Sequence, residues 1–95
     1  MRERLLVDES SVLHLPRYVR LGFDQLRACW LVLAPERMYV PDKIALEILK
    51  RLDGVRRIEL IVDTLAKEHA AERKTIATDV LKLLQELADK GLVST

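Results

Sequence analysis

The sequence predicts an α+β domain in which a three-stranded antiparallel β-meander is followed by three α-helices. Two observations predict this order. Residues 16–40 are rich in β-branched and aromatic residues separated by turn residues, whereas from Asp42 onward apolar residues recur at helical spacing. A chain of 95 residues, 49% hydrophobic and 33% charged, is long enough for one domain with one core.

The first fifteen residues are expected to form an N-terminal arm, and residues 16–95 the domain itself. The arm has no clear period, but apolar residues run from Leu5 to Leu15, more than a solvated tail carries. A flexible arm is the ordinary state of a terminus. The alternative is that the arm packs on a second copy of the chain, which would make the protein a homodimer.

Three strands are expected between Pro16 and Pro41. Residues 18–23 and 29–34 form the first two, and residues 24–27 close the hairpin between them. The next turn, residues 34–37, has Pro35 at its second position, where the fixed φ of proline is suited to a tight turn. Residues 38–40 then form a short third strand, which ends at Pro41.

Three helices follow the strands. Asp42 is a good N-cap for the first helix, whose apolar residues continue to Leu52 before Gly54 stops it. The second helix ends near His69, and the third runs from about Glu72 to a stop at Gly91. The helices could form a helix-turn-helix with the strands as its wing, which is a winged-helix arrangement.

The last helix carries two apolar stripes. At about 100° per residue, one stripe contains Ile76, Val80, Leu83 and Leu87, and the second contains Ala77, Leu81, Leu84 and Ala88. Charged residues, among them Asp79 and Glu86, take the opposite side. Either both stripes are buried against two neighbours, or the second stripe lines one wall of a cleft. These two interpretations have similar weight.

The cleft interpretation predicts a peptide-binding site. The third strand is the last of its meander, so its edge could pair with an incoming extended peptide whose apolar side chains enter pockets along the last helix. The site would consist of a strand edge, part of the second stripe and its polar rim: Arg37, Met38, Tyr39, Val40, Lys74, Ala77, Leu81, Leu84 and Gln85.

Composition excludes several other classes of function. The net charge of +1 lacks the basic surplus that phosphate binding requires, so we expect no nucleic-acid partner. Cys29 is the only cysteine, and His14 and His69 are isolated, so we expect no disulfide, metal site or cofactor. Ser10 and Ser11 near His14 lack an orienting acid, so we expect no enzyme activity. No apolar run is long enough to cross a bilayer, and no signal peptide precedes the domain, so a cytoplasmic location is expected.

A family resemblance is carried mainly by the strand region. The run Leu-Ala-Pro-Glu-Arg at residues 33–37 is its most specific element, preceded by Arg-Leu-Gly-Phe-Asp at residues 20–24 and by Trp30. With Asp53-Gly54 and Lys90-Gly91-Leu92 further on, these residues resemble the PqqD family of pyrroloquinoline quinone (PQQ) biosynthesis. The likeness covers nearly everything from Pro16 to Val93. Departures are Arg57 for a threonine that would cap the second helix, Pro41-Asp42 for a Leu-Asn pair, and His69 for a tyrosine.

The resemblance implies a RiPP recognition element, a domain that captures the leader peptides of ribosomally made natural products. By this analogy the chain binds the precursor peptide PqqA and presents it to PqqE, a radical S-adenosylmethionine enzyme. Its contribution would be to raise the effective concentration of the substrate and to orient it.

Two alternatives stay open. The first is a DNA-binding winged-helix regulator, which the same scaffold permits. However, the last helix interleaves Arg73, Lys74 and Lys82 with acidic residues, which disfavours a surface facing phosphates. The second is a pure dimerisation module, which the apolar N-terminal arm would support.

Overall fold

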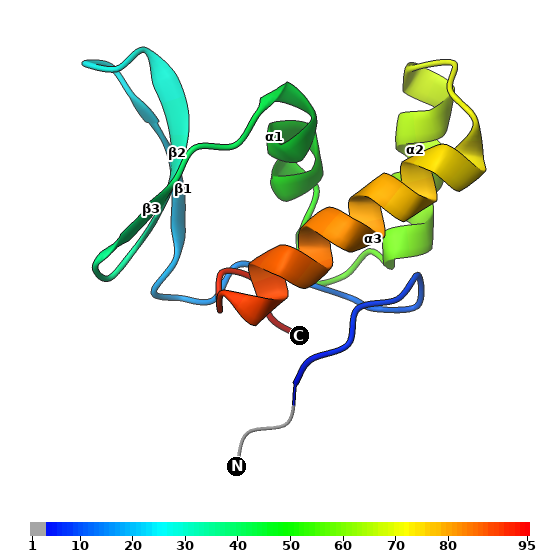
Figure 1. The fold of residues 1–95 in the computed structure, drawn as a ribbon, viewed down its shortest axis with the longest axis horizontal. Helices are drawn as coiled ribbons and strands as arrows, with labels where there is room; N and C mark the ends of the chain where they lie inside the picture. Colours follow the sequence, from blue (N-terminus) through cyan, green and yellow to red (C-terminus); the bar gives the residue numbers. More distant parts are fainter. Residues whose placement is uncertain (1–3) are drawn as a thin grey trace.

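A computed structural model, which describes residues 4–95, has the predicted α+β architecture. The strands β1 (Arg20–Asp24), β2 (Cys29–Ala34) and β3 (Arg37–Tyr39) are followed by the helices α1 (Lys43–Lys50), α2 (Ile58–Glu68) and α3 (Arg73–Asp89). Figure 1 shows the sheet at one end of the molecule, with α1 between the sheet and α2, and with α3 running past both helices. Within residues 4–95 no helix combines the length and apolar content needed to cross a membrane.

The sheet is an antiparallel meander with β2 in the centre. The predicted hairpin closes at residues 24–27, where Arg27 pairs with Asp24 at 2.8 Å. The second turn is also as predicted: Pro35 and Glu36 connect β2 to β3, and Glu36 takes the positive φ of 60° that this tight turn requires. The prediction for β3 was one residue out, because the strand begins at Arg37 and ends at Tyr39, leaving Val40 outside.

Helix α1 begins as predicted but ends early. The Asp42 carboxylate accepts a hydrogen bond from the backbone N–H of Ala45 at 2.8 Å, as an N-cap should. Leu52 was predicted inside this helix, but α1 ends at Lys50. The N–H of Leu52 bonds instead to the carbonyl of Leu49 in a tighter final turn, and the N–H of Gly54 bonds to Leu13 of the arm. The arm therefore binds a backbone N–H that a longer α1 would have used within the helix.

The ends of α2 and α3 follow local rules. Arg57 gives α2 no side-chain cap, and Glu59 in the first turn places a negative charge near the positive end of the helix dipole. Gly91 ends α3 with a φ of 76°, and the N–H of Leu92 reaches back to the carbonyl of Leu87. Ala70 ends α2 in the same way, with an unusual positive φ of 47° for alanine.

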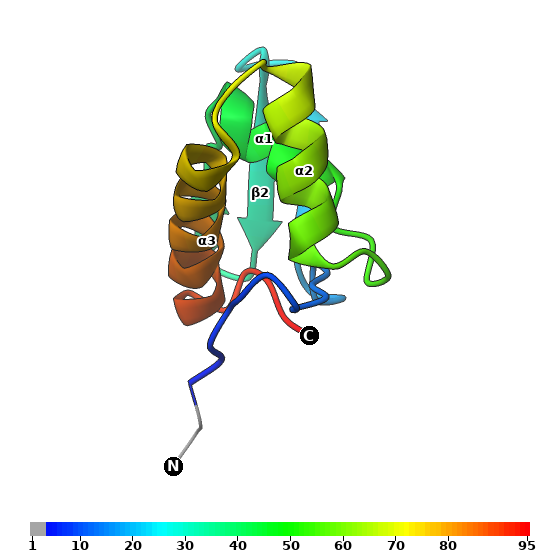
Figure 2. The ribbon, with the colours of Figure 1, turned by 90° about the vertical axis from the view of Figure 1, so that its right-hand side faces the viewer.

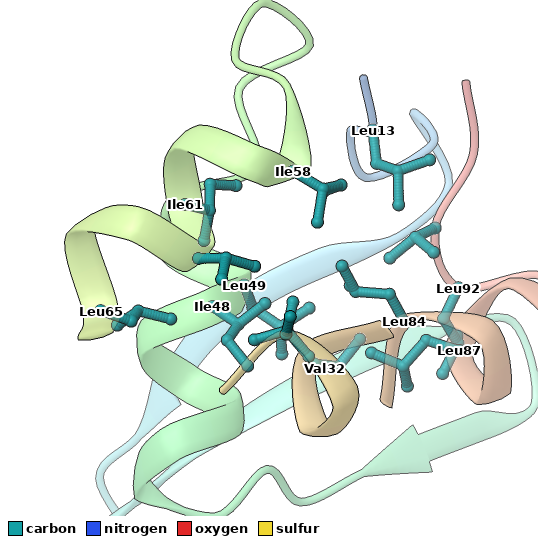
Figure 3. Close-up of a cluster of buried hydrophobic side chains, with 14 of the residues drawn as sticks. Leu13, Val32, Ile48, Leu49, Ile58, Ile61, Leu65, Leu84, Leu87 and Leu92 are labelled. Atoms are coloured by element: carbon teal, nitrogen blue, oxygen red, sulfur yellow. The ribbon is translucent and has the colours of Figure 1, made fainter. Parts of the chain in front are cut away.

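The core lies between the sheet and the three helices and also receives side chains from both ends of the described chain (Figure 3). Leu13 of the arm and Leu92 and Val93 after α3 are buried in it together with Val32 of β2. The largest fully buried side chains are Leu13, Val32, Ile48, Ile58, Ile61, Val62, Leu65, Val80, Leu84 and Leu87.

The N-terminal arm packs on its own chain. Val12 forms an isolated antiparallel bridge with Arg57, and His14 forms another with Ser94. Further up the arm, the Gln85 side chain on α3 accepts from the N–H of Val7 and donates to the carbonyl of Leu5, at 2.9 and 2.8 Å. Figure 2 shows the arm and the C-terminal segment crossing beneath the helices. Packing of the arm on a second copy stays a prediction.

Candidate functional site

The edge of β3 is open. In the described sheet β3 pairs only with β2, so the backbone groups on its other side have no strand partner. Met38 and Val40 are 51% and 55% exposed, which is a large fraction for apolar side chains. Tyr39 and Arg37 lie on the other face of the strand, the face that Val32 shares. A short, exposed and apolar edge of this kind is suited to pairing with another extended chain.

A trough of ≈ 230 Å³ lies between the start of α1 and one side of α3, and its rim residue Asp42 follows the end of β3 by three positions in the chain. Its floor is apolar and its rim carries two carboxylates. It is lined by Asp42, Ile44, Ala45, Ile48, Asp79 and Leu83. We refer to this feature as the α1–α3 trough.

A second hollow continues the trough toward the turn between α2 and α3. It measures ≈ 210 Å³ and shares Ile44 and Asp79 with the trough. It is lined by Ile44, Leu65, His69, Ala71, Ile76, Asp79 and Val80. We refer to it as the distal hollow.

Charged groups of both signs surround the β3 end of the site. The Arg37 guanidinium donates to the carbonyl of Lys90 at the end of α3, and the Lys90 ammonium lies 5.7 Å from the centre of the Tyr39 ring. Partial burial, followed by the negative charges of Asp42 and Glu86, raises the pKa of Tyr39. Tyr39 therefore stays neutral at physiological pH and keeps a phenolic O–H that can donate a hydrogen bond.

Two residues of the predicted helix wall of the site do not line an open cleft. Leu84 is 0% and Ala77 8% exposed, so both belong to the core and neither lines an open cleft. Gln85 bonds to the arm, and Leu81, one turn earlier on that side, is partly buried against the core. The second stripe is thus covered by the core and the chain's own arm.

Lys74 lies outside the site as well. It is exposed and accepts a hydrogen bond at its carbonyl from Thr78, on the flank of α3 that carries Gln85. The four predicted strand residues, Arg37, Met38, Tyr39 and Val40, do lie at the open edge of β3, whereas the structure does not bring Lys74, Ala77, Leu81, Leu84 and Gln85 to it.

The helix residues that do border the edge were assigned elsewhere by the sequence. Leu83 was placed in the core stripe, and Asp79 and Glu86 on the solvated side, yet all three face the trough or Tyr39. Ile44, one of the apolar residues at helical spacing in α1, is 55% exposed and lines both hollows. The apolar residues of the arm could have indicated which stripe is covered. Leu5 and Val7 pack against the domain, and Gln85 on the flank of the second stripe bonds to both.

The site holds no arrangement typical of catalysis. Among residues 4–95, no group of three or more His, Cys, Asp or Glu side chains is placed to bind a metal ion. His69, the histidine nearest the site, bonds through Nε2 to the Glu47 carboxylate at 2.9 Å, on the rim of the distal hollow. The groups at this site are the free backbone groups of β3, apolar cavity walls and a few charges.

Comparison with known proteins gives a consistent result. Residues 29–93 match the family described as "Coenzyme PQQ synthesis protein D (PqqD)". A protein of Rhodopseudomonas palustris strain BisB5, named PqqA binding protein, is 48% identical over 90 residues, which are 95% of this chain and 88% of the relative. A Gluconobacter oxydans protein of the same name is 43% identical, with coverage of 95% and 94%.

Two solved structures share the fold. One is the solution structure of the PqqD truncation of Methylobacterium extorquens PqqCD, described as a functional, stand-alone RiPP recognition element. It has a TM-score of 0.80 and 36% identity, with coverage of 94% of this chain and 95% of the other. The other is the crystal structure of PqqD from Xanthomonas campestris, with a TM-score of 0.61, 38% identity, and coverage of 94% and 99%.

Proposed function

Because this chain belongs to the PqqD family, we propose that it binds the precursor peptide PqqA in PQQ biosynthesis as an extended strand along the open edge of β3. The observation that carries the proposal is the open edge of β3, which is followed in the chain by Asp42 at the rim of the α1–α3 trough. The peptide backbone pairs with β3, and alternate side chains point toward the trough and toward solvent.

The chemistry of the trough favours apolar peptide residues flanked by basic or neutral ones. Ile44, Ala45, Ile48 and Leu83 supply the apolar surface, whereas Asp42 and Asp79 supply negative charge at the rim. An acidic residue at that point would be repelled, while Arg37 at the start of β3 would attract one. The site thus selects the direction of the peptide by charge as well as by shape.

The domain performs no chemistry of its own in this proposal. It presents PqqA to the radical S-adenosylmethionine enzyme PqqE, and its effect is to raise the local concentration of the substrate at that enzyme. Its cytoplasmic location stays a prediction.

The first experiment is a calorimetric titration of the chain with a synthetic PqqA precursor peptide, with a DNA duplex as the control ligand. We expect saturable one-to-one binding of the peptide and no heat with DNA. Peptides methylated on alternate backbone nitrogens should lose affinity in one register only, because each edge of a strand uses every second N–H. Absence of peptide binding, or binding of the duplex that weakens with salt, would overturn the proposal.

The DNA-binding alternative gains no support from the charges of α3. Arg73 is engaged by Glu9 of the arm and by Asp63 of α2. On the side that faces β3, α3 presents Asp79 and Glu86. The side of α3 that carries Asp79 and Glu86 therefore repels phosphates.

A further inference from the structure

We infer that the distal hollow is a second anchoring pocket, which takes an apolar side chain of the peptide beyond the segment that pairs with β3. The inference rests on the proposed function, since the occupant is the same PqqA peptide. Five of its seven lining residues are aliphatic, and they come from α1, α2, α3 and the turn between α2 and α3.

The walls of the distal hollow are built for an apolar group. Leu65 and Val80, each 1% exposed, place core side chains at its base, and Ile76 and Ala71 form its sides. A cavity of about 150 Å³ with such a lining is large enough for a benzene ring, and this one measures ≈ 210 Å³. An aliphatic or aromatic side chain therefore fits, and its burial would displace water from an apolar surface.

The distal hollow adjoins the α1–α3 trough, so the peptide that occupies the trough is the one expected to occupy the hollow. Ile44 and Asp79 line both the distal hollow and the trough, so a peptide seated in the trough lies next to the distal hollow. Leu83 and Ile76 mark the two pockets on α3. Seven residues of helix rise about 10 Å, which about three residues of extended peptide span.

The charged residues at the rim of the distal hollow determine which peptide side chains can lie next to the anchoring one. Asp79 stands between the two pockets, and Glu47 and His69 form a bonded pair at the outer rim. Because alternate side chains of an extended peptide face the same side, the peptide should carry two apolar residues two or four positions apart. Near Asp79 it should carry a basic or hydroxyl side chain rather than a carboxylate. This pattern is a specificity rule that the strand edge alone does not supply.

Ala71 offers a direct test, because it lines the distal hollow from an exposed position after α2. Ala71→Leu fills the hollow without touching the trough or β3. The matched control, Thr78→Leu, adds apolar surface at an exposed position on the other side of α3. Both variants are titrated with the synthetic PqqA peptide, after thermal unfolding has shown that each is folded.

We expect Ala71→Leu to weaken peptide binding about tenfold or more, and Thr78→Leu to leave it within about twofold. Equal affinity of Ala71→Leu and the unaltered chain would overturn the inference while the proposed function stood. Failure of the unaltered chain to bind the peptide would overturn both.

A second measurement does not depend on the variant's folding. Nuclear Overhauser contacts in the complex should connect an apolar peptide side chain to the methyl groups of Ile76 and Ile44. Contacts to Ile44 alone would place the peptide in the trough only and would contradict a second anchor.

Discussion

Leu81 and Leu83 lie two positions apart on α3, and two residues turn a helix by about 200°. Both are partly buried against the core, but Leu81 shares its flank with Gln85, which bonds to the arm, whereas Leu83 lines the trough. The same substitution at these two leucines therefore tests the two sides of α3 separately.

We expect Leu83→Gln to weaken PqqA binding about tenfold, or about 1.4 kcal/mol, because it puts a polar group into an apolar pocket. Leu81→Gln should lower the free energy of unfolding but leave the affinity within about threefold. Calorimetry and urea unfolding of both variants check this. Loss of binding in Leu81→Gln alone would restore the second stripe as the wall of the site.

For single residues, the sequence best predicted the features that depend only on residues nearby in the chain. The Asp42 cap, the missing cap at Arg57 and the stop at Gly91 are all confirmed, since each depends on a few adjacent residues. The prediction that Leu84 lines an open cleft was wrong, because the environment of this residue depends on which elements flank α3. A helical wheel shows that two stripes are apolar but not which one the core takes.

The arm is the element whose role the sequence left most open. Leu13 is fully buried, and backbone bonds join Ser11 to Ile58 and His14 to Ser94. These contacts link the arm to the start of α2 and to the segment after α3.

Deleting residues 1–15 should lower the free energy of unfolding by about 3–5 kcal/mol, because loss of a buried leucine alone costs about 2–5 kcal/mol. Urea unfolding measures the change. Deleting only residues 1–4 is the control, since it removes the exposed Arg4–Asp89 ion pair and should cost no more than about 1 kcal/mol. Unchanged stability of the longer deletion would contradict the burial of Leu13, whereas a doubled mass for the intact chain in solution would favour an arm exchanged between two copies.

Element order and type could be read from the sequence because strand and helix periods differ. The boundaries of β3 and α1 could not, since Val40 and Leu52 lie where local preference ends and long-range contacts begin. Gly54 was expected to stop α1, but its N–H is bonded to Leu13, more than forty residues away. Periodicity carries no information about a partner so distant.

For the molecule as a whole, acid should be destabilising. The pKa values of Asp8, Asp24, Asp53 and Asp89 are all lowered, chiefly by hydrogen bonds from Ser10, Arg27, the Arg56 backbone and Arg4 respectively. A carboxylate whose pKa is lower in the folded state stabilises the fold above its unfolded value and loses that contribution as the pH falls through its folded pKa.

We therefore expect the thermal midpoint to be steady near neutral pH and to fall below about pH 4. Calorimetric scans across this range check it. Asp24→Asn, which removes one such group from an exposed hairpin, should make the fall less steep. A midpoint that rises on acidification would contradict the assignment.

The pairing of His14 with Ser94 also bears on how the domain forms during synthesis. Leu92 and Val93 are buried, and the strand-like bridge beside them joins segments eighty residues apart. The core therefore cannot close until residues 92–94 have left the ribosome. Until then the apolar side chains of the arm have no completed surface to cover.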